Sequence, residues 1–103
     1  MQSVTKENFK TFLSSAEDLA VLDYWADWCG PCRMLSQTVE ELAEENPQIA
    51  FGKVNVDEEG ELAMQAKIES IPALIVYREG EEIERFVGWR PKEELQALLE
   101  ALL

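Results

Sequence analysis

The most informative part of the sequence is Leu19-Ala20-Val21-Leu22-Asp23-Tyr24-Trp25-Ala26, which continues directly into Asp27-Trp28-Cys29-Gly30-Pro31-Cys32. Its first part is apolar over strand length except for one acid, which predicts a strand buried on both faces at the centre of a sheet. Its second part opens a helix, because Pro31 suits a first-turn position. An apolar stripe at helical spacing follows, made of Leu35, Val39, Leu42 and Ala43. A buried strand that leads through a short loop into a helix is typical of an α/β domain.

The rest of the chain continues this alternation of helices and strands. Thr5 can cap a first helix over 6–14, and residues 1–4 are long enough only for a short strand at a sheet edge. Further strands are predicted at 49–56, at 73–77 after Pro72, and at 83–87 after a hairpin turn at 78–81. Helices are predicted at 57–66 and from Pro91 onward. We expect one domain over 1–103, with a sheet that is parallel at the crossovers and antiparallel at the hairpin.

Composition narrows the chemistry that the chain can perform. Its 103 residues include 21 acidic and 9 basic side chains, which leaves a net charge of −12 and argues against a nucleic-acid partner. There is no histidine, and two cysteines are too few for a stapled miniprotein or a four-cysteine metal site, so we expect no metal and no bound cofactor. The sequence shows neither a signal peptide nor a run long enough to cross a membrane. The prediction is a cytoplasmic protein.

The two cysteines, Cys29 and Cys32, lie at the predicted start of the helix. The free N–H groups and the positive dipole end of a helix favour an anion, so a thiolate is stabilised there. We expect Cys29 to be exposed and Cys32 to be shielded within the first turn. A structural disulfide would close too short a loop to constrain the unfolded chain, and zinc would lack two ligands. The pair therefore predicts reversible thiol–disulfide chemistry.

The segment 23–32 resembles the active-site region of the thioredoxin family. The resemblance extends to Lys53-Val54-Asn55-Val56-Asp57, to Ser70-Ile71-Pro72-Ala73, to Gly80 and to Val87-Gly88-Trp89. It implies a thioredoxin fold, with a single central mixed five-stranded sheet flanked by four helices. It also implies a protein-disulfide reductase that carries electrons in cell redox homeostasis. Its partners would be disulfide-containing proteins and a thioredoxin reductase, with NADPH as the electron source, and we expect a monomer.

The residues and the resemblance together assign roles at the site. Cys29 is expected to attack a substrate disulfide and Cys32 to resolve the mixed disulfide. Asp23 is either a half-exposed acid at a strand end or a buried carboxyl whose pKa is raised. The resemblance implies the second reading, with Asp23 as acceptor of the Cys32 proton. It also implies that Lys53 lies near Asp23, although the side chain could instead extend to solvent.

The resemblance also implies a surface on which substrates bind. It predicts a cis Ile71–Pro72 bond facing the cysteines, with the Ile71 backbone pairing with an extended substrate segment. An exposed apolar rim around Cys29 would consist of Trp28, Gly30, Pro31, Ile71, Pro72, Gly88 and Trp89. The alternative is that Trp28 and Trp89 are core residues, and Trp25 is expected to be structural.

Some positions depart from the family pattern, and other functions stay open. Gln37 stands where many members have a helix-kinking proline, so a straighter helix is expected. Arg33 and Ala73 replace a common lysine and a common threonine. The competing functions are a binding or scaffold subunit of the same fold, and a dithiol oxidase or isomerase. Gly30-Pro31 between the cysteines favours the reducing type.

Overall fold

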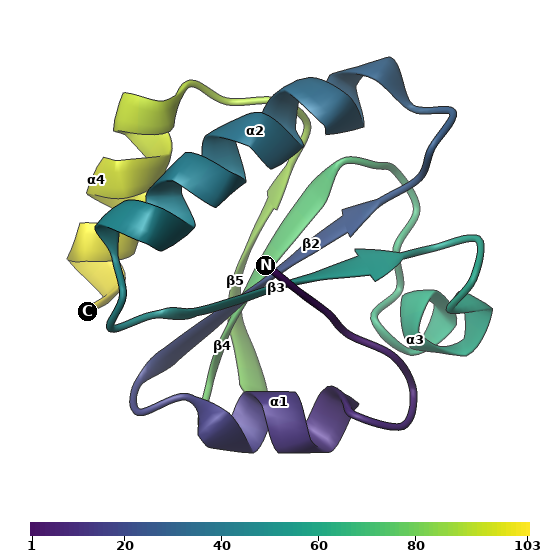
Figure 1. Cartoon of the computed structure of the whole chain (residues 1–103), viewed down its shortest axis with the longest axis horizontal. Helices are drawn as coiled ribbons and strands as arrows, with labels where there is room; N and C mark the ends of the chain where they lie inside the picture. Colours follow the sequence, from purple (N-terminus) through teal and green to yellow (C-terminus); the bar gives the residue numbers. More distant parts are fainter.

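The computed structural model describes residues 1–103, in which five strands and four helices follow one another along the chain (Figure 1). The strands are β1 (Gln2–Ser3), β2 (Leu19–Trp25), β3 (Ala50–Asn55), β4 (Ala73–Arg78) and β5 (Glu81–Val87). The helices are α1 (Phe9–Ser15), α2 (Gly30–Glu45), α3 (Gly60–Gln65) and α4 (Lys92–Leu102). The predicted number of strands and helices is confirmed. None of the helices has the length and apolar character needed to cross a membrane.

The five strands form one mixed sheet in the order β1-β3-β2-β4-β5. The central strand β2 is parallel to β3 and antiparallel to β4, and β4 and β5 form an antiparallel hairpin. Six of the seven residues of β2 are buried, as the apolar run predicts. The position of β2 explains this burial, because a strand with neighbours on both edges and helices over both faces has no side exposed to water.

Two hydrophobic cores lie on the two faces of the sheet. Figure 1 shows α2 and α4 over one face and α1 and α3 over the other. Leu19 and Val21 of β2 pack in the core beneath α2 and α4, whereas Ala20, Leu22 and Tyr24 pack in the opposite core. Alternate residues of a strand point to opposite faces, so Asp23 belongs to the α2 side.

The hairpin between β4 and β5 turns at Glu79 and Gly80. Both residues have positive φ, 53° and 81°, and paired left-handed residues form the two-residue turn whose twist matches a hairpin. The predicted turn is confirmed, but β5 begins at Glu81, two residues earlier than expected. Because the turn contains only two residues, Glu81 already pairs with Arg78 in the sheet.

Two predicted helix starts are wrong. The first helix begins at Phe9 instead of residue 6, and Thr5 does not cap it. Asn8 accounts for the difference, because its Oδ1 accepts the Thr5 N–H at 2.8 Å and its own N–H donates to the Thr5 carbonyl. These bonds close a separate turn before the helix. Similarly, α3 begins at Gly60 instead of residue 57, because the Asn55 side chain accepts the N–H of Asp57 in a turn.

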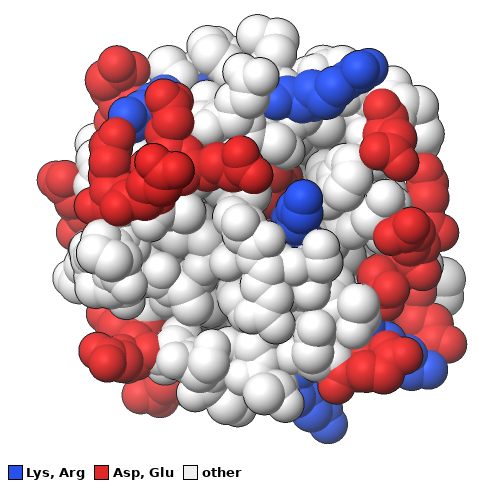
Figure 2. Space-filling view, in the orientation of Figure 1, with Lys and Arg blue, Asp and Glu red and all other residues white.

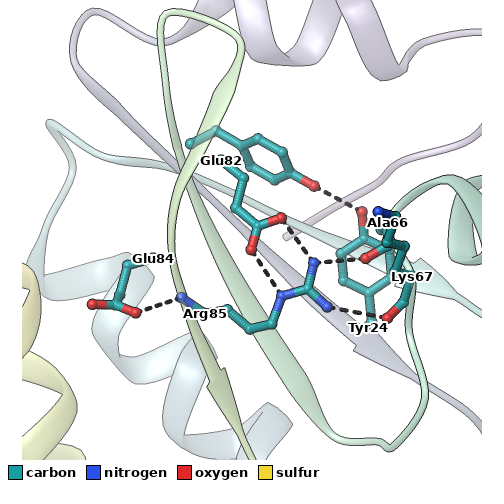
Figure 3. Close-up of polar contacts among 7 residues, drawn as sticks. Tyr24, Ala66, Lys67, Glu82, Glu84 and Arg85 are labelled. Carbon is teal, nitrogen blue, oxygen red and sulfur yellow. Dashed lines mark hydrogen bonds and ion pairs between the residues drawn. The ribbon is translucent and has the colours of Figure 1, made fainter.

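Arg85 ties β5 to the end of α3 (Figure 3). Its guanidinium donates to the carbonyl oxygens of Ala66 at 2.6 Å and Lys67 at 3.2 Å. It also makes two bonds of 2.8 Å to the Glu82 carboxylate. Lys67 has a φ of 56°, the left-handed conformation that often follows the end of a helix. Arg85 therefore holds the segment that leads from α3 towards the Ile71–Pro72 bond.

Candidate functional site

The two cysteines form a disulfide at the N-terminus of α2, with Cα atoms 5.2 Å apart. Cys29 is the N-cap residue, and its Sγ accepts the backbone N–H of Cys32 at 3.2 Å. Pro31 lies in the first turn, where its missing N–H would have had no partner in the helix. The helix thus directs a backbone N–H at the sulfur of Cys29, a geometry that also stabilises a thiolate there.

The prediction of an exposed Cys29 is wrong for this oxidised protein. Cys29 is 5% exposed and Cys32 is fully buried, so only the shielding of Cys32 is confirmed. The Cys29 Sγ is bonded to the Cys32 sulfur on one side and lies 4.0 Å from the Ile71 carbonyl oxygen on another. The disulfide and the Ile71 loop together leave little of this sulfur open to water.

The Ile71–Pro72 peptide bond is cis, as predicted, and the loop that contains it lies beside Cys29. The Pro72 carbonyl accepts the N–H of Gly88 at 2.8 Å, which ties the start of β4 to the end of β5. Gly88 has a φ of 91°, a conformation that favours glycine. The fold thus brings Cys29, Ile71 and Gly88 together from three separate parts of the chain.

The residues of the predicted apolar rim are exposed or half-buried, with one exception. Trp28 is 68% exposed and Trp89 is 48% exposed, so neither is a core residue. Gly30 and Pro31 are exposed, and Ile71 and Gly88 are half-buried. Pro72, which was expected to be exposed, is buried because it lies directly before the buried strand β4. We use the term active-site rim for the six residues Trp28, Gly30, Pro31, Ile71, Gly88 and Trp89.

Asp23 is a fully buried carboxyl on the α2 side of the sheet. Its Oδ2 accepts a hydrogen bond of 3.0 Å from the Ser36 hydroxyl, and its Oδ1 has no partner within the protein. Burial raises the pKa of Asp23 from 3.8 to about 6, and the Ser36 bond and the Lys53 charge oppose that rise. The prediction of a half-exposed acid is therefore wrong, and the predicted buried carboxyl is confirmed.

Lys53 lies next to Asp23 in the sheet. The two residues are register partners on the parallel strands β2 and β3, and Lys53 is half-buried. Its Nζ lies 5.5 Å from the centre of the half-buried Trp25 ring, within the range of a cation–π contact. The ammonium therefore stays near the carboxyl, where its charge lowers the pKa of Asp23.

Sequence reasoning missed two residues of this site. Asp57 accepts the Trp28 Nε1–H at 2.9 Å and so orients an exposed indole ring of the rim. Ser36 holds the buried carboxyl of Asp23. Ser36 could have been found, because it follows Cys32 by four residues and therefore lies on the same face of the helix. The helix α2 runs from Gly30 to Glu45, with Gln37 in its interior.

A helix-terminal pair of cysteines, a cis-proline loop beside it and a buried carboxyl beneath the helix define a thiol–disulfide oxidoreductase. The chain belongs to the thioredoxin family, because the family model described as Thioredoxin matches residues 1–101. It is 43% identical to the thioredoxin of Chlamydia pneumoniae over 96 residues, which cover 93% of this chain and 92% of that protein. It is 38% identical to Thioredoxin-2 of Saccharomyces cerevisiae over 97 residues, 94% of this chain and 93% of that protein.

A solved structure supports the same assignment. The X-ray structure of Fasciola hepatica thioredoxin matches with a TM-score of 0.91 and 30% identity, and it covers 100% of both chains. The chain has the thioredoxin fold and is a protein-disulfide reductase of the thioredoxin type, with Cys29 and Cys32 as its redox-active pair.

Proposed function

We propose that Cys29 is the attacking thiolate and Cys32 the resolving thiol. In the reduced protein, the Cys29 thiolate attacks one sulfur of a substrate disulfide, forms a mixed disulfide and releases the other sulfur as a thiolate. Cys32 then loses its proton and attacks the Cys29 sulfur, which breaks the mixed disulfide and releases the second substrate thiolate. Two electrons pass to the substrate, and the protein is left with the Cys29–Cys32 disulfide. The N–H bond from Cys32 to the Cys29 sulfur supports this order of events.

Asp23 is the proposed acceptor of the Cys32 proton. A buried carboxyl with a pKa of about 6 is ionised at neutral pH yet basic enough to take a proton from a thiol. Lys53 favours the charged form of this carboxyl, because it is the register partner of Asp23 on the adjacent strand and carries a positive charge. Both roles concern the resolving step and not the attack of Cys29.

Substrates are proposed to bind at the active-site rim. The Ile71 backbone lies beside the Cys29 sulfur and is half-buried, so it can pair with an extended substrate segment by main-chain hydrogen bonds. The exposed rings of Trp28 and Trp89 add apolar contact area without selecting a particular side chain. Such binding suits a reductase with many protein substrates.

The proposed partners are a thioredoxin reductase that recharges the dithiol with electrons from NADPH, and disulfide-containing proteins. We propose that the protein is cytoplasmic, because a dithiol reductant works in a compartment where thiols are kept reduced. We also propose that it is a monomer.

On the face drawn in Figure 2, acidic side chains gather towards its left and right sides, and the middle is mostly uncharged. Together with the net charge of −12, this distribution favours basic partners over nucleic acid.

The position of the Cys29–Cys32 disulfide at the helix N-terminus carries the proposal, and insulin reduction in the presence of a thioredoxin reductase and NADPH tests it. Cys29→Ser is expected to abolish turnover. Cys32→Ser is expected to accumulate a mixed disulfide with insulin that mass spectrometry detects. Thr38→Ala, on the same helix away from the cysteines, is the control and should retain activity. Full activity of Cys29→Ser would refute the assignment.

The cysteine variants and a measurement of the redox potential distinguish a reductase from the competing functions. A scaffold subunit would support its partner after either cysteine is replaced, whereas an electron carrier would not. An oxidase or isomerase would have a higher redox potential, so equilibration of the Cys29–Cys32 pair with glutathione distinguishes the two. We expect a potential near the thioredoxin value of about −270 mV, well below that of an oxidase at about −120 mV.

A further inference from the structure

Ser36 donates its hydroxyl into the interior of the protein, unlike its neighbour Thr38. A serine or threonine within a helix commonly donates to the carbonyl four residues before it. Thr38 does so, with its Oγ1 3.4 Å from the Met34 carbonyl oxygen. Ser36 instead donates to Oδ2 of Asp23 at 3.0 Å. The hydroxyl of Ser36 is therefore used in a tertiary contact between α2 and β2.

The place of Ser36 on α2 connects this contact to the redox pair. Ser36 follows Cys32 by four residues, so the two side chains lie on one face of the helix, one turn apart. Asp23 lies on the side of β2 that packs beneath α2, and its Oδ1 has no partner within the protein. One oxygen of the carboxyl is thus held by the helix that carries Cys32, and the other is free to accept a proton.

We propose that Ser36 is a positioning residue for the resolving step, which holds Oδ2 of Asp23 so that Oδ1 receives the proton released by Cys32. This inference rests on the proposed role of Asp23 as proton acceptor. The proton moves from the Cys32 sulfur to the Asp23 carboxylate, and the electron pair left on the sulfur attacks the Cys29 sulfur. The bond between Cys29 and the substrate sulfur breaks, and the substrate leaves as a thiolate. The Ser36 hydroxyl keeps its own proton and stabilises the charged carboxylate before the transfer.

The other charged groups that act on Asp23 do not make the hydrogen bond that Ser36 makes. Lys53 acts from β3 and favours the charged carboxylate, whereas Glu40 acts from α2 and disfavours it. The register partner on β4 is Leu74, which carries no charge. Of the two groups that oppose the effect of burial on the pKa of Asp23, Ser36 has the larger influence. Loss of the hydroxyl should therefore move the titration of this carboxyl upward.

The experiment compares Ser36→Ala with the control Thr38→Ala in two measurements. The first is the pH titration of the Asp23 carboxyl by 13C NMR in the oxidised protein, where neither cysteine titrates. Because the chain has only four aspartates, aspartate-labelled protein gives separable signals. We expect the Asp23 midpoint to rise by about one pH unit in Ser36→Ala and to stay unchanged in Thr38→Ala. Alanine is the best helix former, so α2 should stay intact.

The second measurement is the rate at which Cys32 resolves a preformed mixed disulfide on Cys29, followed from pH 5 to pH 8. The low-pH limb of this profile should move up with the Asp23 midpoint in Ser36→Ala, and it should be lost in Asp23→Asn. An unchanged Asp23 titration in Ser36→Ala overturns the role of Ser36 alone. A limb that survives in Asp23→Asn overturns the role of Asp23, whatever the titration of Ser36→Ala shows.

Discussion

Replacement of Asp23 by asparagine should stabilise the protein, and the gain should depend on pH. The buried carboxyl has a pKa of about 6 in the folded chain against 3.8 as its ordinary value. The folded state therefore binds this proton more tightly than the unfolded state does. The contribution of Asp23 to folding stability is fully present below pH 3.8 and is lost as pH rises through about 6, because ionisation then occurs at a buried site.

The size of the effect follows from the two pKa values. At 1.36 kcal/mol per unit, the rise in the pKa of Asp23 corresponds to about 3 kcal/mol of lost stability at pH 8. At pH 4.5 the same linkage leaves a loss of about 1 kcal/mol. Asparagine has nearly the same shape, and its side-chain oxygen can still accept the Ser36 hydroxyl. The Asp23→Asn protein should therefore be more stable by these amounts.

Urea denaturation of the oxidised proteins at pH 4.5 and pH 8 measures the difference in the free energy of unfolding. The comparison within each pH cancels the titration of the other carboxylates. Asp27→Asn is the matched control, since Asp27 is exposed, and its effect should stay within about 0.5 kcal/mol at both pH values. A gain for Asp23→Asn that is equal at the two pH values, or a loss at pH 8, would show that burial of the Asp23 charge does not cause the effect.

Three further predictions concern the charged groups. Lys53→Met should raise the pKa of Asp23 and Glu40→Gln should lower it, because the two charges act on the carboxyl in opposite directions. A 13C NMR titration measures both shifts, and two shifts of the same sign would contradict the prediction. Arg85→Met should reduce the free energy of unfolding by about 1–2 kcal/mol, because the two backbone carbonyls that accept from its guanidinium lose that donor. Lys6→Met is the control, since Lys6 is exposed, and it should change this free energy by less than about 0.5 kcal/mol in the same urea assay. Equal losses in Arg85→Met and Lys6→Met would contradict the role of Arg85. Reduction of basic protein disulfides should slow as salt is raised from about 0.02 M to about 0.5 M, while reduction of a small neutral disulfide should not; equal salt dependence would argue against steering by the acidic surface.

Much of the fold could be predicted because its signals are local. The apolar run of β2 demands burial on both faces wherever it lies, which places it at the centre of the sheet. The glycine at position 80 permits the two-residue turn between β4 and β5. The wrong start of α1 has a local cause as well, since the Asn8 side chain competes for the backbone N–H of Thr5.

For the functional site, the chemistry could be predicted from the sequence, but most of the contacts could not. The amino-acid sequence is enough to identify the chemistry, because two cysteines at a helix N-terminus with no histidine leave thiol–disulfide exchange as the available reaction. The groups that surround the two cysteines, in contrast, are known only from the three-dimensional structure. The Ile71 carbonyl lies beside Cys29 although 42 residues separate them, and Ser36 reaches Asp23 only because α2 packs on that side of β2. Such contacts depend on how distant elements pack against one another, and local propensity holds no information about that packing.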